Sequence, residues 1–318
     1  MERRSFLAAT AATGLGSAAA SAATGAAPSL TGPYIDLTTG KGTMLALARM
    51  DGNLDETKVK YGGASGIVSA VRANEKVRDL FGFEVLSVGQ TRKQADGSYR
   101  ILHRETIFYT DLATGDVLSE YRNPFTDETV KVVDVINDPW NLHIEEFEPR
   151  PPSYGGLNKI EDGPRKPHVL NWREIGGGLV TALRNINLFY PSALQPEQWP
   201  RESAGKMAQV SETYTFVVKL ADLQNPDLTS VTYGGSWSRV TPWLPWLLMG
   251  QAPGHIVYHS TTFNGDDLKY VKPKVVAHAQ KHHPHMLEPP SEDSVAKPNL
   301  SSLENYARTQ KPAPVPKS

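Results

Sequence analysis

The feature that most constrains the fold is a series of short runs rich in Val, Thr, Tyr and Ile, separated by turn signals. The clearest run covers residues 99–109, where apolar and polar residues alternate with the two-residue period of a strand. Turn residues at 110–116, 123–127 and 137–139 then separate three further runs, at 117–122, 129–136 and 142–147. Four short runs at regular spacing predict an antiparallel meander.

More strands are expected on both sides of this meander. We predict them at 56–61, 66–72, 81–91, 168–174, 178–189, 209–218, 230–237 and 255–263, with short helices at 42–50, 220–224 and 301–308. This number of strands exceeds what an open sheet holds comfortably. We therefore expect a mainly β fold, in which the meander closes into a single lipocalin-like barrel or a barrel-like sheet with few short helices. A two-sheet β-sandwich is the alternative.

The chain divides into three segments by composition. Residues 1–27 begin with a charged Arg3-Arg4 pair, continue with small and weakly apolar residues, and are typical of a twin-arginine signal that is removed near Ala22 or Ala27. We therefore expect a periplasmic location. Residues 28–288 are expected to form a single β-rich domain with a long loop at 149–167. Residues 289–318 are rich in Pro, Ser and Lys and are expected to be an extended or disordered tail.

Charge and cysteine content exclude several function classes. The formal net charge is −1, so no basic excess favours nucleic acid or an anionic membrane surface as a partner. No apolar run after the signal is long enough to span a membrane. Cysteine is absent, which excludes disulfides, thiolate metal sites and cysteine nucleophiles. The expected partner is a small molecule, and the sequence leaves the oligomeric state open.

An aromatic cluster stands out between residues 233 and 250. It contains three tryptophans within ten residues, two nearby prolines and one arginine, and its candidate substrate-binding residues are Tyr233, Trp237, Arg239, Trp243 and Trp246. Tryptophan offers a large apolar face and one N–H donor, which suits the wall of a pocket for an aromatic or other ring-bearing compound. An apolar plug at one end of a barrel is an equally good interpretation.

Titratable residues occur on otherwise apolar strand faces. His103 and Glu105 alternate with Ile101 and Ile107, and Asp134 and Glu212 occur in similar patterns. If these faces line an interior, burial raises the pKa of a carboxyl group and brings a general acid or base near neutrality. If the faces point outward, the charges are simply solvated. The sequence does not decide which face is interior.

The candidate catalytic residues come from these strands. They are His103, Glu105, His143 and Glu145 as acids or bases, with Tyr109 and Tyr121 as proton donors or oxyanion stabilisers. His143 and Glu145 share a strand face and form a weak metal-ligand or base-plus-carboxylate pattern. The dense histidines at 278, 282, 283 and 285 are interpreted as solvated or adventitiously metal-binding, so no metal site is assigned.

Several longer motifs are similar to those of a known family. They are residues 108–115, Asn123-Pro124, residues 137–141, residues 235–239 and residues 242–246. Together they resemble the domain of unknown function 1838 family, whose members often have export signals. The resemblance covers most of the chain after the signal, and it implies one domain without implying catalytic residues or a mechanism.

Three functions are compatible with these observations. The first is an exported, cofactor-independent enzyme that binds a small aromatic or ring-bearing compound in a barrel-like cavity and acts by acid–base chemistry, as a lyase, isomerase, hydratase or hydrolase. The second is a non-catalytic periplasmic binding or carrier protein for apolar small molecules. The third is a metal-dependent hydrolase, although the histidine spacing does not demand a metal. The position of His103 and Glu105 separates the first two, because a carrier does not need titratable groups inside its cavity.

Overall fold

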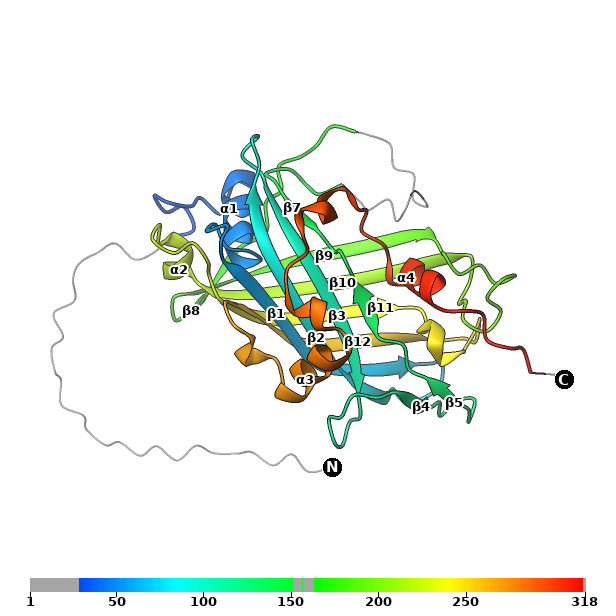
Figure 1. The fold of residues 1–318 in the computed structure, drawn as a ribbon. Helices are drawn as coiled ribbons and strands as arrows, with labels where there is room; N and C mark the ends of the chain where they lie inside the picture. Colours follow the sequence, from blue (N-terminus) through cyan, green and yellow to red (C-terminus); the bar gives the residue numbers. More distant parts are fainter. Residues whose placement is uncertain (1–28, 151–155, 157–162, 317–318) are drawn as a thin grey trace, which may run out of the picture.

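One large antiparallel sheet forms most of the molecule in the computed structural model, which describes residues 29–150, 156 and 163–316 (Figure 1). Its strand order is β6-β3-β2-β1-β12-β11-β10-β9-β8, and β7 pairs with β3 beside β6. The strands are β1 Val59–Val71, β2 Arg78–Lys93, β3 Tyr99–Thr110, β6 Val135–Asn137, β7 Leu142–Ile144, β8 Arg173–Gly176, β9 Leu179–Pro191, β10 Met207–Lys219, β11 Tyr233–Thr241 and β12 His255–Gly265. The mainly β, antiparallel prediction is confirmed.

Part of the predicted meander is wrong. β4 (Glu120–Arg122) and β5 (Thr129–Lys131) pair with each other in a separate two-stranded sheet, and β6 and β7 return to the edge of β3 instead. The reason is length, because β3 has twelve residues and no single three-residue run can cover its edge. Two short strands therefore share that edge, on either side of the irregular segment Asp138–Asn141.

The helices are short and lie at the ends and against the faces of the sheet (Figure 1). They are α1 Gly40–Met50, α2 Leu220–Gln224, α3 Pro273–His282 and α4 Ser302–Thr309, with 3-10 helices η1 Pro245–Leu247, η2 Leu268–Tyr270, η3 Pro284–Leu287 and η4 Glu292–Ala296. Residues 289–316, expected as an extended or disordered tail, thus include η4 and α4. None of the helices in the described part of the chain is both long and apolar enough to cross a membrane. The signal segment and most of the loop expected at 149–167 lie outside the described residues.

Glycines let the long strands bend and approach each other closely. A Cβ at Gly235 of β11 would lie 1.8 Å from the carbonyl oxygen of Thr215 on β10. A Cβ at Gly66 of β1 would lie 2.7 Å from the Phe83 ring on β2. Glycine inside a strand often marks such a bend or close approach. The sheet can therefore curve, so that one of its faces encloses an interior.

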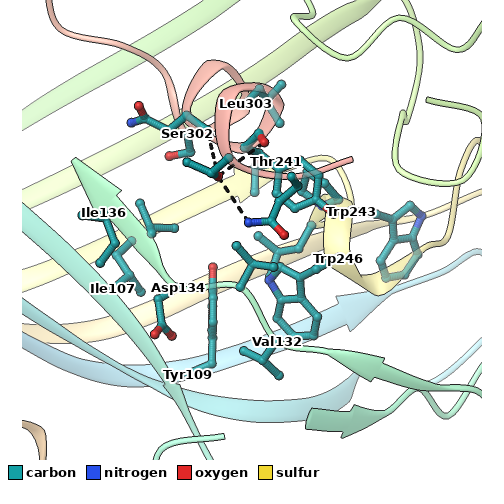
Figure 2. Close-up of a pocket in the computed structure, with 18 of the residues that line it drawn as sticks. Ile107, Tyr109, Val132, Asp134, Ile136, Thr241, Trp243, Trp246, Ser302 and Leu303 are labelled. Atoms are coloured by element: carbon teal, nitrogen blue, oxygen red, sulfur yellow. Dashed lines mark hydrogen bonds between the residues drawn. The ribbon is translucent and has the colours of Figure 1, made fainter. Parts of the chain in front are cut away.

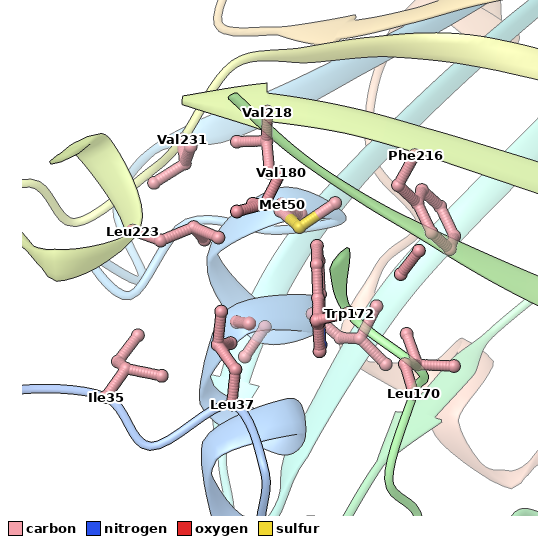
Figure 3. Packing of buried hydrophobic residues seen from close by; sticks show 14 of the residues in the cluster. Ile35, Leu37, Met50, Leu170, Trp172, Val180, Phe216, Val218, Leu223 and Val231 are labelled. Atoms are coloured by element: carbon pink, nitrogen blue, oxygen red, sulfur yellow. The ribbon is translucent and has the colours of Figure 1, made fainter. Parts of the chain in front are cut away.

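α1 fills one end of this interior (Figure 3). Its small and apolar side chains pack between Trp172, Phe216 and Val218, and the N-cap hydroxyl of Thr39 accepts a hydrogen bond from the Gly42 backbone N–H. The cluster joins strands from both halves of the chain, with Ile101 on β3, Val180 on β9 and Phe216 on β10. Burial of the apolar side chains of this cluster is the main source of stability at this end.

A second core cluster fills the opposite end. Phe81 packs edge to face against Tyr109 and Tyr121 and lies tilted against Trp246, at centroid distances of 5.1–5.2 Å. Trp243 is also buried there, and its indole N–H donates to the Ala252 carbonyl oxygen at 2.8 Å. The three predicted wall tryptophans, Trp237, Trp243 and Trp246, all belong to this buried cluster, and Trp243 and Trp246 also line a cavity.

A single buried arginine joins α1 to α2. Arg49 is 0 % exposed, and its guanidinium donates to the backbone carbonyl oxygens of Asp222, Leu223, Asn225 and Leu228 at 2.7–3.0 Å. These four charge-assisted bonds engage two carbonyl groups of α2 and two of the loop that follows it. This arrangement ties residues near position 50 to residues near position 225, and it closes the end of the sheet that α1 fills.

We expect Arg49→Leu to lower the free energy of unfolding by about 4 kcal/mol, because four buried carbonyl groups would lose their donors. Urea denaturation followed by tryptophan fluorescence measures this change. Lys41→Ala on the exposed side of the same helix is the control and should have little effect. A loss below about 1 kcal/mol for Arg49→Leu would show that the α1–α2 junction is not cooperative with the sheet.

Candidate functional site

A cavity of about 530 Å³ lies between the inner face of the sheet and α4 (Figure 2). Figure 2 shows Ser302 and Leu303 of α4 on one side of it, and Tyr109 and Val132 on the other. Strands near both lateral edges of the sheet contribute, with Ile107 from β3 and Tyr190 from β9. The walls are mostly aliphatic and aromatic, and polar groups enter at a few points. This combination is typical of a small-molecule site.

The alternation of β3 places the predicted catalytic face inside. Ile101 packs with α1, Ile107 and Tyr109 pack in the second core cluster, and His103 and Glu105 lie between them on the same face. The opposite face is also covered, because Phe108 packs against Val275 and Ala279 of α3. Sequence alone could not choose between the two faces because both Phe108 and Tyr109 are fully buried.

Glu212 and Arg239 are directly opposite each other on β10 and β11 and face the interior. Arg239 Nη1 lies 3.7 Å from Glu212 Oε1, while Glu212 Oε2 accepts hydrogen bonds from the Tyr214 hydroxyl and the Trp237 indole N–H. Burial lowers the pKa of Arg239, but Glu212 and nearby tyrosines outweigh burial and hold it above its ordinary value. Arg239 is therefore a fixed cation at the cavity wall.

Glu105 is the interior carboxyl group that titrates near neutrality. Burial and the repulsion of Glu212 raise its pKa to about 7, and a hydrogen bond from Asn137 and the charge of Arg239 oppose this rise. Asn137 Nδ2 donates to Glu105 Oε1 at 3.2 Å. A carboxyl group in this state can donate or accept a proton with little cost at pH 7.

His103 lies two residues before Glu105 on the same face of β3, but its pKa shifts in the opposite direction. Burial lowers its pKa to about 4, so the imidazole is neutral at pH 7. Its Nδ1 atom is buried, and no hydrogen-bond partner for it occurs among the described residues. His103 is thus a neutral interior group and a poor proton acceptor at neutral pH.

Two tyrosines form a hydrogen-bonded pair at the cavity wall. The hydroxyls of Tyr109 and Tyr258 lie 3.0 Å apart, and both residues line the cavity with Arg239. Burial raises the pKa of Tyr258 to about 12, so it remains a phenol at neutral pH. A phenol pair beside a guanidinium can donate hydrogen bonds to an oxygen that gains negative charge.

Two cavity-lining side chains have a buried N–H group with no partner in the described part of the chain. These groups are Arg239 Nε and Trp246 Nε1. A buried donor without an acceptor costs about 1–3 kcal/mol, so native proteins usually supply one. An acceptor that enters the cavity would satisfy this requirement.

Tyr233 and Tyr121 lie away from the cavity. The Tyr233 hydroxyl donates to Asp51 Oδ1 at 2.9 Å, and Asp51 also faces Arg184 at 3.8 Å. Tyr121 packs on Phe81, and its hydroxyl donates to the Leu80 carbonyl oxygen at 3.3 Å. Both hydroxyls are therefore engaged in structural contacts.

His143 and Glu145 do not join the interior group. His143 is directly opposite Arg100, on the face of β3 that points away from Glu105, and its side chain is 45 % exposed. Glu145 binds Arg165 through both carboxylate oxygens at 2.5 and 2.6 Å, which lowers its pKa. This pair of residues forms a surface ion-pair cluster.

The histidine-rich segment also meets an acid predicted from the sequence. His278 and His283 place Nε2 atoms 3.8 and 4.0 Å from Asp134 Oδ2 at the rim of the cavity. Burial raises the pKa of Asp134 to about 6. In the described ranges, no group of three or more histidine and carboxylate side chains is placed to hold a metal ion.

Sequence reasoning missed three contributors to the site. Tyr258 alternates with Ile256 on a recognised strand, and Asn137 stands in a recognised turn, so neither suggested a role in a site. The cavity-lining residues of α4 belong to the segment that was expected to be a tail. These residues come together only through strand pairing and through the return of the C-terminal segment to the cavity.

Comparison with known proteins identifies the family of the chain. No curated protein matches the chain. A family model described as protein of unknown function (DUF1838) matches residues 60–310, which include β1 through α4 and every residue of the cavity wall named above. The chain therefore belongs to the DUF1838 family.

Proposed function

We propose that the protein is an enzyme that binds a small ring-bearing compound in this cavity and acts on it by acid–base chemistry. Glu105 is the proton carrier, Tyr109 and Tyr258 are hydrogen-bond donors, and Arg239 is the anchor. The chemistry is of the lyase, isomerase, hydratase or hydrolase type and uses no organic cofactor. The finer fold that we infer is an incompletely closed barrel, because strands from both ends of the sheet line one cavity.

The observation that supports binding is the pair of partnerless donors, Arg239 Nε and Trp246 Nε1, in a mostly apolar cavity. Apolar walls bind the body of a ligand, and a few directed polar groups orient it. The volume, about 530 Å³, is in the range of pockets for small molecules. A compound with a ring and at least one oxygen acceptor fits both requirements.

The observation that supports catalysis is the interior position of Glu105. It lies two residues before Ile107 on the same face of β3, so it borders the inner end of the cavity. A ligand that reaches past Arg239 would meet a carboxyl group with a pKa of about 7 and two phenols. Together they can transfer a proton and stabilise the oxygen that gains charge.

The second candidate is the carrier protein. It is favoured by the fact that Ile107 and Tyr109 contribute to the cavity wall while Glu105 lies beyond it. Of the groups proposed for catalysis, a ligand confined to the cavity would contact Arg239, Tyr109 and Tyr258 but not Glu105. The third candidate, a metal-dependent hydrolase, draws no support from the described residues.

Binding is tested with 8-anilinonaphthalene-1-sulfonate, a fluorescent probe with aromatic rings and one anionic group. We expect saturable binding that Arg239→Gln weakens at least tenfold, because the cation at the wall is lost. Arg122→Gln, at an exposed ion pair, is the matched control and should leave binding unchanged. Equal binding by wild type and Arg239→Gln would exclude Arg239 as the anchor.

Glu105→Gln is expected to abolish turnover of compounds found by probe displacement, while probe binding persists. The variant also has an effect that needs no substrate. The pKa of Glu105 is raised to about 7 from an ordinary 4.5, so the folded wild type binds a proton more tightly than the unfolded chain. Wild-type stability should therefore fall between pH 4.5 and 7, by about 3 kcal/mol relative to Glu105→Gln.

Urea denaturation at pH 4.5, 6 and 8 measures this difference. Glu120→Gln, at an exposed position of β4, is the control and should track the wild type at every pH. A constant difference between wild type and Glu105→Gln over this range would mean that Glu105 does not titrate near neutrality. Turnover retained by Glu105→Gln would instead remove it as the proton carrier.

We also propose that the chain is exported to the periplasm by the twin-arginine route, on the basis of Arg3-Arg4 and the segment that follows. Intact-mass measurement of the periplasmic fraction should find a chain that begins after Ala22 or Ala27. Replacement of both arginines by lysine should leave the full-length chain in the cytoplasm. A periplasmic protein that retains residues 1–27 would contradict the proposal.

A further inference from the structure

α4 covers the cavity without being part of the core. Ser302, Leu303, Asn305 and Tyr306 line the cavity from this helix, yet none of the α4 residues is fully buried. The capping box between Ser301 and Glu304 stabilises the helix itself. Leu303 packs beside Tyr190 and Val210 of the sheet, and Tyr306 packs against the second core cluster, with its ring 5.8 Å from the Trp199 ring in the connection between β9 and β10.

A chain of amide hydrogen bonds connects α4 to the interior acid. Asn305 Nδ2 donates to Asn137 Oδ1 at 3.0 Å, and Asn137 Nδ2 donates to Glu105 Oε1 at 3.2 Å. Asn137 is only 4 % exposed and is directly opposite Glu105 in the β3–β6 register. The site therefore has two asparagines in series between the outer helix and the carboxyl group.

The hydrogen bond from Asn305 of α4 determines whether the oxygen or the N–H group of the Asn137 amide faces Glu105. An asparagine side chain has one accepting and one donating end, and a half-turn about its last bond exchanges them. Because Asn305 donates to Oδ1, the N–H group of Asn137 is left facing Glu105. Without Asn305, the amide could turn and present its oxygen to Glu105, which favours the protonated carboxyl group.

We propose that α4 is a lid over the cavity and that Asn305, acting through Asn137, is a positioning residue for Glu105. This inference rests on the proposed function, because it assigns to α4 the control of Glu105, the acid of that site. Closure of the lid supplies a donor to the carboxylate form, so closure promotes loss of the proton. By reciprocity, loss of the proton stabilises the closed lid.

The other groups that act on Glu105 come from three strands. Glu212 on β10 repels its charge, Arg239 on β11 attracts it, and the buried Tyr214 hydroxyl interacts with it. His103 on β3 is neutral at pH 7 and adds no charge. None of these groups belongs to α4, so a variant of the lid leaves them in place.

The experiment measures the pKa of Glu105 directly in the ligand-free, full-length mature protein. Glutamate labelled with ¹³C at Cδ is titrated by NMR, and the Glu105 signal is assigned by its loss in Glu105→Gln. Asn305→Ala should raise the Glu105 pKa by about one pH unit, because the carboxylate loses a charge-assisted donor. Gln310→Ala is the matched control, since Gln310 also lines the cavity and its side chain bonds to Thr309 alone among the described residues.

Tyr306→Ala tests the lid itself, because it removes the contact with Trp199 and keeps Asn305. We expect it to raise the Glu105 pKa in the same direction. An unchanged pKa in Asn305→Ala would overturn the positioning role, and a rise in Asn305→Ala without one in Tyr306→Ala would overturn the lid. The titration contains no ligand, so its outcome is separate from probe binding and turnover, whose failure would count against the proposed function alone.

Discussion

A curved antiparallel sheet has two end strands whose backbone groups need partners, and the rest of this molecule is arranged around that need. At one end β6 and β7 cover part of β3, and at the other β8 covers only the beginning of β9. The helix α4 contacts both of these ends, through Asn137 of β6 and through Tyr190 of β9. The site exists because the closing elements are loops and one short helix, not another strand.

The interior is unusual in containing charge. Asp51 faces Arg184 at one end, and Glu212 faces Arg239 nearer the cavity, so two carboxylates are matched by two guanidinium groups. Glu105 has no ion-pair partner among the described residues. Burial and the repulsion of Glu212 raise its pKa to about 7. A buried charge without a partner is costly, so burial favours the protonated form of Glu105. The matched pairs make the remaining acid responsive to small changes around it.

Sequence patterns predicted the strands well where they were long. The runs at 209–218 and 255–263 fall within β10 and β12, and the short helix at 220–224 is α2, because alternation and turn signals act locally. Pairing was harder: the three-residue runs after β3 had no local signal for their partners. α3 was missed because its histidines were interpreted as solvated or adventitiously metal-binding residues and not as part of a helix. Likewise, His143 and Glu145 shared a face as predicted, but the arginine that engages Glu145 lies at position 165.

The Arg49 contacts bear on where the folding unit begins. The family match starts at residue 60, after α1, while Arg49 binds four carbonyl groups in α2 and the loop after it. Ile35, Leu37, Leu47 and Met50 belong to the same core cluster as Phe216. A chain cut at the family boundary would leave a hydrophobic hollow open to water at one end of the sheet. The folding unit of this protein therefore extends beyond the segment that the family model matches.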